Sequence, residues 1–215
     1  MSLPELYQSF YDGLIHTGPI EFIAVIAGIV SVWFSRKESI WVYPTGLVNT
    51  TLYVYLSIKS HLLGEASVNF YYTIMSIYGW WLWTRKDELS GTPVLSITHN
   101  SRKDWQQQLL FVTGAYCLLL AALIWAKKSF APEAIPLADA FASATAYTGM
   151  WCMAKKKVAS WYFWIATNLA SSPLYFVKGF MFTSVQFLVL LILAIAGLIS
   201  WQQKAAQSST TSSSL

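Results

Sequence analysis

Charged residues are scarce in this sequence. Asp, Glu, Lys and Arg together make up 11% of its 215 residues, whereas a soluble domain usually has about 25%. Hydrophobic residues make up 55% and aromatic residues 16%, so the composition excludes a disordered chain and favours an integral membrane protein over a soluble domain. The net charge of +4 is small and spread over short loops, so it bears on membrane topology and not on nucleic-acid binding.

Sequence patterns of catalysis and redox chemistry are missing as well. The two cysteines lie in apolar runs and imply no disulfide framework. No HExxH, GxSxG or P-loop motif is present. The three histidines fall in predicted loops or termini, which disfavours a pair of haem ligands within the spans: His16, His61 and His99. We therefore expect no enzyme activity, no cofactor and no metal site.

Long apolar stretches, in contrast, are abundant. A helix needs about 20 mostly apolar residues to cross a bilayer, and the sequence predicts seven spans, at 19–35, 40–58, 66–84, 107–126, 136–154, 160–177 and 181–202. Ten of the fourteen Lys and Arg residues then lie on one side, which the positive-inside rule makes cytoplasmic. We expect residues 1–18 outside, the loop 85–106 in the cytoplasm, and 203–215 as a disordered cytoplasmic tail.

An internal repeat groups these spans. Five pairs of residues share a spacing of 118, and each half therefore has an acid, Trp, Lys, Gly and Trp in the same order: Glu21 and Asp139, Trp33 and Trp151, Lys37 and Lys155, Gly79 and Gly197, Trp83 and Trp201. The middle of the repeat is less regular, since Trp41 pairs with Trp161 at a spacing of 120. The repeat divides six of the spans into two halves, 19–84 and 136–202.

The odd number of spans in each half determines how the halves are oriented. Two three-helix halves joined directly would point in opposite directions across the membrane. The unpaired span at 107–126 reverses the chain once more and makes the halves parallel. We therefore predict an all-α integral membrane protein with a 3+1+3 arrangement. Transporters built from such repeats place the substrate site between the halves, near the middle of the membrane.

One predicted helix face carries candidate binding residues. The stretch WYFWIATN, residues 161–168, places Trp161, Trp164 and Asn168 on a single face. Indole rings stack on flat aromatic or cationic ligands, and an amide both donates and accepts hydrogen bonds. The alternatives are an interfacial tryptophan belt and helix–helix hydrogen bonds of about 0.6 kcal/mol each. Because Trp164 and Asn168 lie deeper than a belt, we interpret this face as one wall of a substrate cavity.

Two acidic residues near span starts have a simpler interpretation. Glu21 and Asp139 each lie close to the first turn of a predicted span. A carboxylate there complements the positive end of the helix dipole. We favour this role over the alternative, a proton relay. No acid or histidine is expected at mid-span, which favours transport without ion coupling. The alternative is a sodium site at carbonyls that Pro44 and Pro173 could free.

Two longer motifs resemble the PnuC family of vitamin transporters. They are SIYGWWLW at 76–83, preceded by VNFYY at 68–72, and WYFWIATN at 161–168, followed by KGFMFTSVQF at 178–187. The resemblance implies a SWEET-like fold of parallel halves, often assembled as a trimer, in the bacterial inner membrane. It also implies facilitated diffusion of nicotinamide riboside, which a cytoplasmic kinase then traps by phosphorylation.

The resemblance also implies which residues face the substrate. Trp161, Trp164 and Asn168 match the family motif of the sixth span. Four further residues match polar or aromatic positions that face the cavity in other spans: Asn49, Asn69, Tyr72 and Gln186. Pro173, five residues after Asn168, departs from the family pattern and leaves the substrate branch open.

Other functions fit the same residues. Thiamine also carries an aromatic cation, so the stacking argument does not separate it from nicotinamide riboside. Riboflavin is larger and neutral and ranks third. A sugar facilitator with the same fold and a membrane-bound enzyme or haem protein are the alternatives outside vitamin transport. The expected partners are thus a small-molecule substrate and the lipid bilayer, without nucleic acid.

Overall fold

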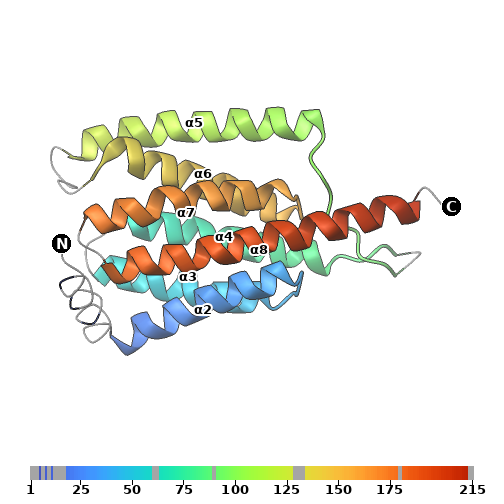
Figure 1. The fold of residues 1–215 in the computed structure, drawn as a ribbon, viewed down its shortest axis with the longest axis horizontal. Helices are drawn as coiled ribbons and strands as arrows, with labels where there is room; N and C mark the ends of the chain where they lie inside the picture. Colours follow the sequence, from blue (N-terminus) through green and yellow to red (C-terminus); the bar gives the residue numbers. More distant parts are fainter. Residues whose placement is uncertain are drawn as a thin grey trace.

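Seven helices make up the protein in the part of the chain that is described, residues 5, 8, 11, 18–59, 63–88, 91–127, 134–178 and 181–212. The structure is a computed structural model. With the labels of Figure 1, its helices are α2 (Pro19–Arg36), α3 (Val42–Lys59), α4 (Leu63–Thr84), α5 (Arg102–Lys127), α6 (Pro136–Ala154), α7 (Ala159–Val177) and α8 (Met181–Ser212). No named strand occurs among these residues, and the all-α prediction is confirmed.

The helices run side by side as two groups of three with one helix outside them (Figure 1). In the first group α3 packs between α2 and α4, and in the second α7 packs between α6 and α8. The groups meet through α4 against α6 and α2 against α8, whereas α5 packs along α6. This is the predicted 3+1+3 arrangement: the third helix of each half lies against the first helix of the other.

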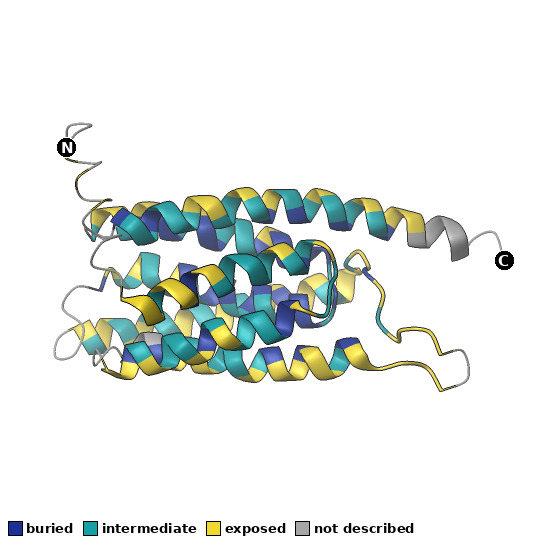
Figure 2. Cartoon of the chain, turned by 90° about the horizontal axis from the view of Figure 1, so that it is seen from below, coloured by how far each residue is buried: buried dark blue, intermediate teal, exposed yellow. Residues whose placement is uncertain are grey.

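The surface of the bundle is suited to lipid. Figure 2 shows exposed residues along the outward sides of the helices and buried residues where helices face one another. By length and hydropathy, three of the described helices qualify as membrane spans, namely α2, α5 and the part of α8 from Met181 to Gln207. The remaining helices contain more polar residues, which they bury against neighbouring helices, as Thr50, Ser76 and Asn168 illustrate.

Two helix boundaries differ from the predicted ones by five residues or more. α5 begins at Arg102 and not at 107, because Ser101 and Asp104 cap its first turn: the Asp104 amide donates to Ser101 Oγ at 3.1 Å, and the Ser101 amide donates to the Asp104 carboxylate at 2.9 Å. α8 continues to Ser212, so the prediction of a disordered tail from 203 is wrong for residues 203–212. Residues 213–215 lie outside the described part.

The repeat of 118 residues is visible in two equivalent contacts, in each of which an aromatic ring packs against a glycine. A Cβ atom placed on Gly79 would lie 2.5 Å from the ring of Tyr43, and one placed on Gly197 would lie 2.5 Å from the ring of Trp161. Tyr43 and Trp161 are 118 residues apart, as are the two glycines. The repeat partner of Trp161 is therefore Tyr43, and the predicted pairing with Trp41 at a spacing of 120 is wrong. The regular spacing extends into the second helix of each half.

The two halves are joined by reciprocal hydrogen bonds at one end of the bundle. Trp83 Nε1 in α4 donates to the Ala154 carbonyl at 3.1 Å, and Trp201 Nε1 in α8 donates to the Ser35 carbonyl at 3.0 Å. The two indole rings lie 6.1 Å apart. Ser35 Oγ also donates to the sulfur of Met153 at 3.0 Å, across 118 residues. Because Arg36, Lys37, Arg85, Lys155 and Lys204 gather here, we call this the basic end.

Close packing of Trp161 on Gly197 makes a prediction about stability. In Gly197→Ala the new methyl group would overlap the indole, and the ring or helix α8 must move. We expect destabilisation of about 1–3 kcal/mol, the usual effect of overpacking. The matched control is Gly114→Ala in α5, where a Cβ meets nothing within 4 Å, and this variant should be as stable as the wild type or more so. Thermal unfolding in detergent compares the two, and equal midpoints would contradict the packing argument.

Candidate substrate site

Four aromatic rings from both halves meet between α4, α6 and α7. Tyr147 of α6 lies 4.6 Å from Tyr71 and 6.4 Å from Tyr72, both in α4, as measured between ring centroids. Tyr72 in turn lies 6.1 Å from Trp164 of α7. We call these four residues the aromatic cluster. Tyr71 and Tyr147 are about halfway along their helices, and the Tyr71 hydroxyl donates to the Tyr147 carbonyl at 3.1 Å.

A glycine on the facing helix sets the position of Trp164. A Cβ on Gly149 of α6 would lie 3.2 Å and 3.3 Å from two indole atoms of Trp164. The indole therefore lies directly on the backbone of α6. The positions equivalent by 118 residues in the first half are Ser31 and Gly46, which also face each other. The first half thus has no ring where the second half has Trp164, so the cluster presents an indole from one side only.

Helix α7 is held on both sides by hydroxyl groups. Thr167 and Thr145 share a hydrogen bond of 2.9 Å between α7 and α6. Ser184 Oγ of α8 donates to the Ser172 carbonyl of α7 at 2.8 Å. Asn168 lies one turn beyond Trp164 and is buried, with 4% of its surface exposed. The backbone of α7 is therefore well supported where it presents the indole and the amide.

Trp161 lies at the other side of Trp164, nearer the basic end. It is 1% exposed and meets Trp201 edge-on at a centroid distance of 5.5 Å. Its repeat partner Tyr43 meets Trp83 in the same way at 5.1 Å. The indole N–H of Trp161 and the hydroxyl of Tyr43 are buried and have no hydrogen-bond partner in the described part of the chain. Trp161 thus belongs to the packing between helices and retains an unused donor.

The remaining predicted site residues are less concentrated. Asn49 donates to the Ala24 carbonyl at 2.7 Å and lies against Gly28, so it joins α3 to α2 within the first half. Asn69 is half-buried in α4, about one turn before Tyr72. Gln186 is half-buried in α8. The structure brings Tyr72 and Trp164 together, places Asn168 one turn away, and shows Asn49 in a role between helices.

Three residues of this region were not predicted: Tyr71, Tyr147 and Gly149. A signal for Tyr147 exists in the sequence, because it is a large ring inside a run of small residues, ASATAYTG. Such a run lets neighbouring helices approach closely, and a ring within it has to face another element. Tyr71 belongs to the VNFYY motif. Helical geometry alone does not show which of Tyr71 and Tyr72 faces the other half.

Acidic residues lie at helix ends and not in the aromatic cluster. Asp139 accepts a hydrogen bond from the Ile135 amide at 2.7 Å and pairs with Lys178 Nζ at 2.7 Å. Its predicted position at a helix start is therefore confirmed, and Glu21 also lies in the first turn of its helix. Within the described ranges, no three His, Cys, Asp or Glu residues are grouped so as to hold a metal ion.

The architecture is that of a multi-pass membrane protein with two three-helix halves and an aromatic cluster between them. The family model described as nicotinamide mononucleotide transporter matches residues 18–203. The chain therefore belongs to this family, the PnuC-type vitamin transporters.

Relatives and a solved structure agree with this assignment. The riboflavin/roseoflavin transporter RibM of Streptomyces davaonensis is 20% identical, with 88% of this chain and 87% of that protein covered. The nicotinamide riboside transporter PnuC of Escherichia coli is also 20% identical, with 87% of each chain covered. The crystal structure of the vitamin B3 transporter PnuC shares the fold, with a TM-score of 0.68 at 21% identity over 94% of this chain and 90% of that one.

The contact between Gly149 and Trp164 generates a prediction about binding. In Gly149→Ala the indole has to shift by a few tenths of an ångström, which the fold tolerates but a stacked ligand does not. We expect affinity for the transported vitamin to fall roughly ten-fold, equivalent to about 1.4 kcal/mol. Calorimetric titration of the purified protein measures it, with Gly114→Ala as the control. Unchanged affinity in Gly149→Ala would show that Trp164 does not stack on the ligand.

Proposed function

We propose that this protein carries nicotinamide riboside across the bacterial inner membrane by facilitated diffusion, with its N-terminus outside and its basic end in the cytoplasm. The observation that carries the proposal is the aromatic cluster, in which Tyr72 and Trp164 lie together and Asn168 follows one turn further along α7. The orientation rests on the gathering of basic residues at one end.

The chemistry of nicotinamide riboside fits these side chains. Its pyridinium ring is a flat cation, which the electron-rich faces of Trp164, Tyr72 and Tyr147 attract. Its carboxamide and ribose hydroxyls need partners that both donate and accept, which amides such as Asn168, Asn69 and Gln186 supply. Trp161 adds a buried N–H without an acceptor in the described residues. In this proposal the indole face selects the cation, and the amides select the polar substituents.

The charge of the proposed site supports trapping by phosphorylation. The aromatic cluster contains no Lys or Arg, and the four ion pairs formed among the described residues lie toward the helix ends. A phosphorylated vitamin carries additional negative charge, which such a site does not stabilise. We therefore propose that a soluble cytoplasmic kinase prevents return of the vitamin. Assembly as a trimer remains an expectation from the family.

Thiamine and riboflavin are the second candidates, and a specific observation supports keeping them. The riboflavin transporter RibM and the nicotinamide riboside transporter of Escherichia coli are equally similar to this chain, at 20% identity each. Thiamine shares the aromatic cation that indole rings attract. Parallel titration with nicotinamide riboside, thiamine, riboflavin and glucose ranks the four ligands directly. Tightest binding of a ligand other than nicotinamide riboside would replace the proposed substrate.

Removal of the indole of Trp164 tests the proposed stacking. A cation–π contact in a site sheltered from water contributes on the order of 2 kcal/mol, so Trp164→Ala should weaken nicotinamide riboside binding roughly thirty-fold. The protein should remain folded, as judged by size-exclusion chromatography and thermal unfolding. Trp41→Ala is the control, because Trp41 is 59% exposed between α2 and α3, and its loss should leave affinity unchanged. Equal affinity in both variants would assign Trp164 a purely structural role.

The energetics of transport can be tested without any variant. Liposomes containing only the purified protein should equilibrate the vitamin and not concentrate it, because no acid or histidine lies at mid-span in the described helices to bind a coupling ion. A sodium or proton gradient should therefore leave the final internal level equal to the external one. Accumulation above the external level would contradict facilitated diffusion and make Glu21 and Asp139 the first residues to substitute.

A further inference from the structure

Among the described residues, two that are not glycine have a left-handed backbone, and they occupy equivalent positions. Glu38 has φ 61° after α2, and Lys156 has φ 51° after α6. They are 118 residues apart. A side chain in this conformation costs about 1–2 kcal/mol, and the residue that usually follows a helix in it is glycine. Both halves retain a long charged side chain instead, which indicates that these side chains have a role beyond the turn.

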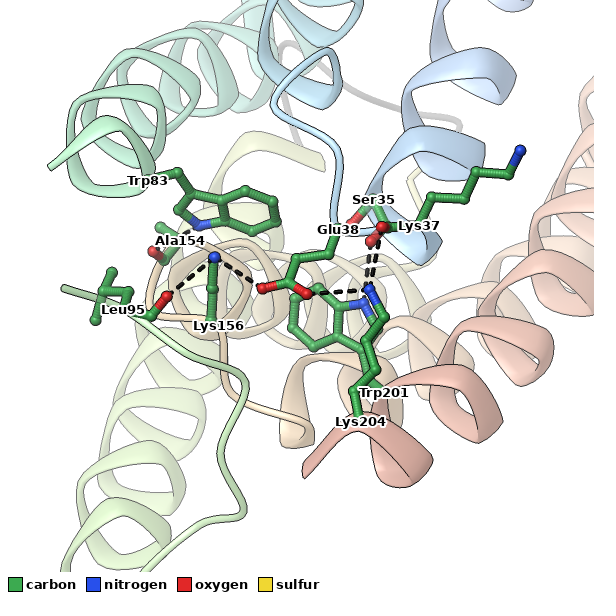
Figure 3. Close-up of polar contacts among 9 residues, drawn as sticks. All are labelled: Ser35, Lys37, Glu38, Trp83, Leu95, Ala154, Lys156, Trp201 and Lys204. Carbon is green, nitrogen blue, oxygen red and sulfur yellow. Dashed lines mark hydrogen bonds and ion pairs between the residues drawn. The ribbon is translucent and has the colours of Figure 1, made fainter. Parts of the chain in front are cut away.

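The two side chains meet each other between the halves (Figure 3). Lys156 Nζ lies 2.8 Å from one carboxylate oxygen of Glu38, and Lys204 Nζ of α8 lies 3.0 Å from the other. The Lys156 side chain is only 7% exposed, and its ammonium lies 4.7 Å from the ring centroid of Trp83. Burial opposes ionisation of Glu38, but the hydrogen bonds and charges of Lys156 and Lys204 outweigh it and hold its pKa below the ordinary value. Glu38 is therefore ionised at neutral pH.

A segment of the loop before α5 lies over this ion pair. We call residues 94–98 the strap. Lys156 Nζ donates to the Leu95 carbonyl at 3.0 Å. The Thr98 amide donates to the Lys156 carbonyl at 3.2 Å, and the Val158 amide donates to the Thr98 carbonyl at 3.1 Å. Ile97 is 3% exposed within the core of the basic end. The strap is thus bound to the loop that follows α6, while its first residue, Val94, donates from its amide to the Arg85 carbonyl just after α4 at 3.1 Å.

The other ion pairs do not connect the halves. Lys157 pairs with Asp104 at 3.0 Å and so joins the second half to α5, which packs on α6. Lys178 and Asp139 both belong to the second half. Among the ion pairs of the described residues, therefore, those of Glu38 alone pass from one half to the other. A movement of one half against the other would separate Glu38 from its partners and leave the other two pairs intact.

We propose that Glu38, Lys156, Lys204 and the strap form a gate that closes the basic end and has to open before substrate leaves on that side. The gate depends on the proposed function in one respect only. The protein must be a transporter that exposes its substrate site to each side of the membrane in turn. Opening separates Glu38 from Lys156 and also parts the Trp83 and Trp201 indoles from their carbonyl acceptors in the opposite half. In the open state, water hydrates the charged and polar groups that have lost their partners. This hydration limits the free-energy difference between the closed and open states.

Cysteine accessibility at Ser35 tests the gate. Ser35 is 3% exposed and lies between the halves at the basic end, so a thiol there becomes accessible only when that end opens. Ser35→Cys is placed in a background of Cys117→Ala and Cys152→Ala. The rate of labelling by a membrane-impermeant maleimide is then measured on the full-length protein in detergent. Loss of a hydrogen bond between charged groups should favour opening by roughly ten-fold or more, and labelling should accelerate accordingly.

Four further substitutions make the result specific. Glu38→Gln and Lys156→Met should both accelerate labelling, whereas Lys156→Arg keeps the charge and should stay near the unsubstituted rate. Lys157→Met removes an ion pair at the same end but within one moving unit, and it should leave the rate unchanged. Unaltered labelling in both Glu38→Gln and Lys156→Met would overturn the gate, as would an equal acceleration in Lys157→Met.

This experiment is independent of the proposed substrate, because labelling requires no vitamin. A protein that shows the expected labelling pattern but carries none of the vitamins tested would overturn the proposed function and leave the gate supported. A protein that carries nicotinamide riboside but shows no effect of Glu38→Gln or Lys156→Met on labelling would support the proposed function and overturn the gate.

Discussion

The buried indole N–H groups of Trp83 and Trp201 impose the constraint on which the arrangement of the halves depends. In the closed bundle no bulk water reaches them, and each finds its acceptor in the opposite half, at Ala154 and Ser35. While the basic end is closed, these bonds hold the halves against each other there. That contact brings α4 next to α6, and the aromatic cluster exists because those two helices are neighbours.

The helix packing is repeated between the two halves, whereas the residues of the candidate site are not. Equivalent ring-on-glycine contacts support both halves, with Tyr43 on Gly79 and Trp161 on Gly197. One turn further, the second half presents Trp164 where the first half has Gly46. In the proposed site, an aromatic face and a polar edge of the ligand would meet different side chains. The two halves therefore share their helix packing and differ in the side chains that lie between them.

Much of the fold could be predicted from sequence, because apolar spans and the repeated positions of Trp and Gly can be recognised in the order of residues alone. The start of α5 was missed because its cap lies in a polar stretch without apolar periodicity. The site was predicted only in part, since it depends on which helices face each other. Trp161 and Trp164 are three residues apart, which turns them about 60° from each other on a helix. That difference directs Trp161 toward α8 and Trp164 toward α6, and the sequence spacing alone did not separate the two.

The opposite charges of Glu38 and Lys156 have a consequence for how the halves associate. Two copies of the first half arranged about the same axis would bring two carboxylates together, and two copies of the second half would bring two ammonium groups together. Both arrangements place like charges in a poorly hydrated contact, which costs several kcal/mol. If the chain were divided between the halves, each half would therefore discriminate against its own copies and select the other. The single chain thus joins two units whose charges favour pairing with each other over pairing with their own copies.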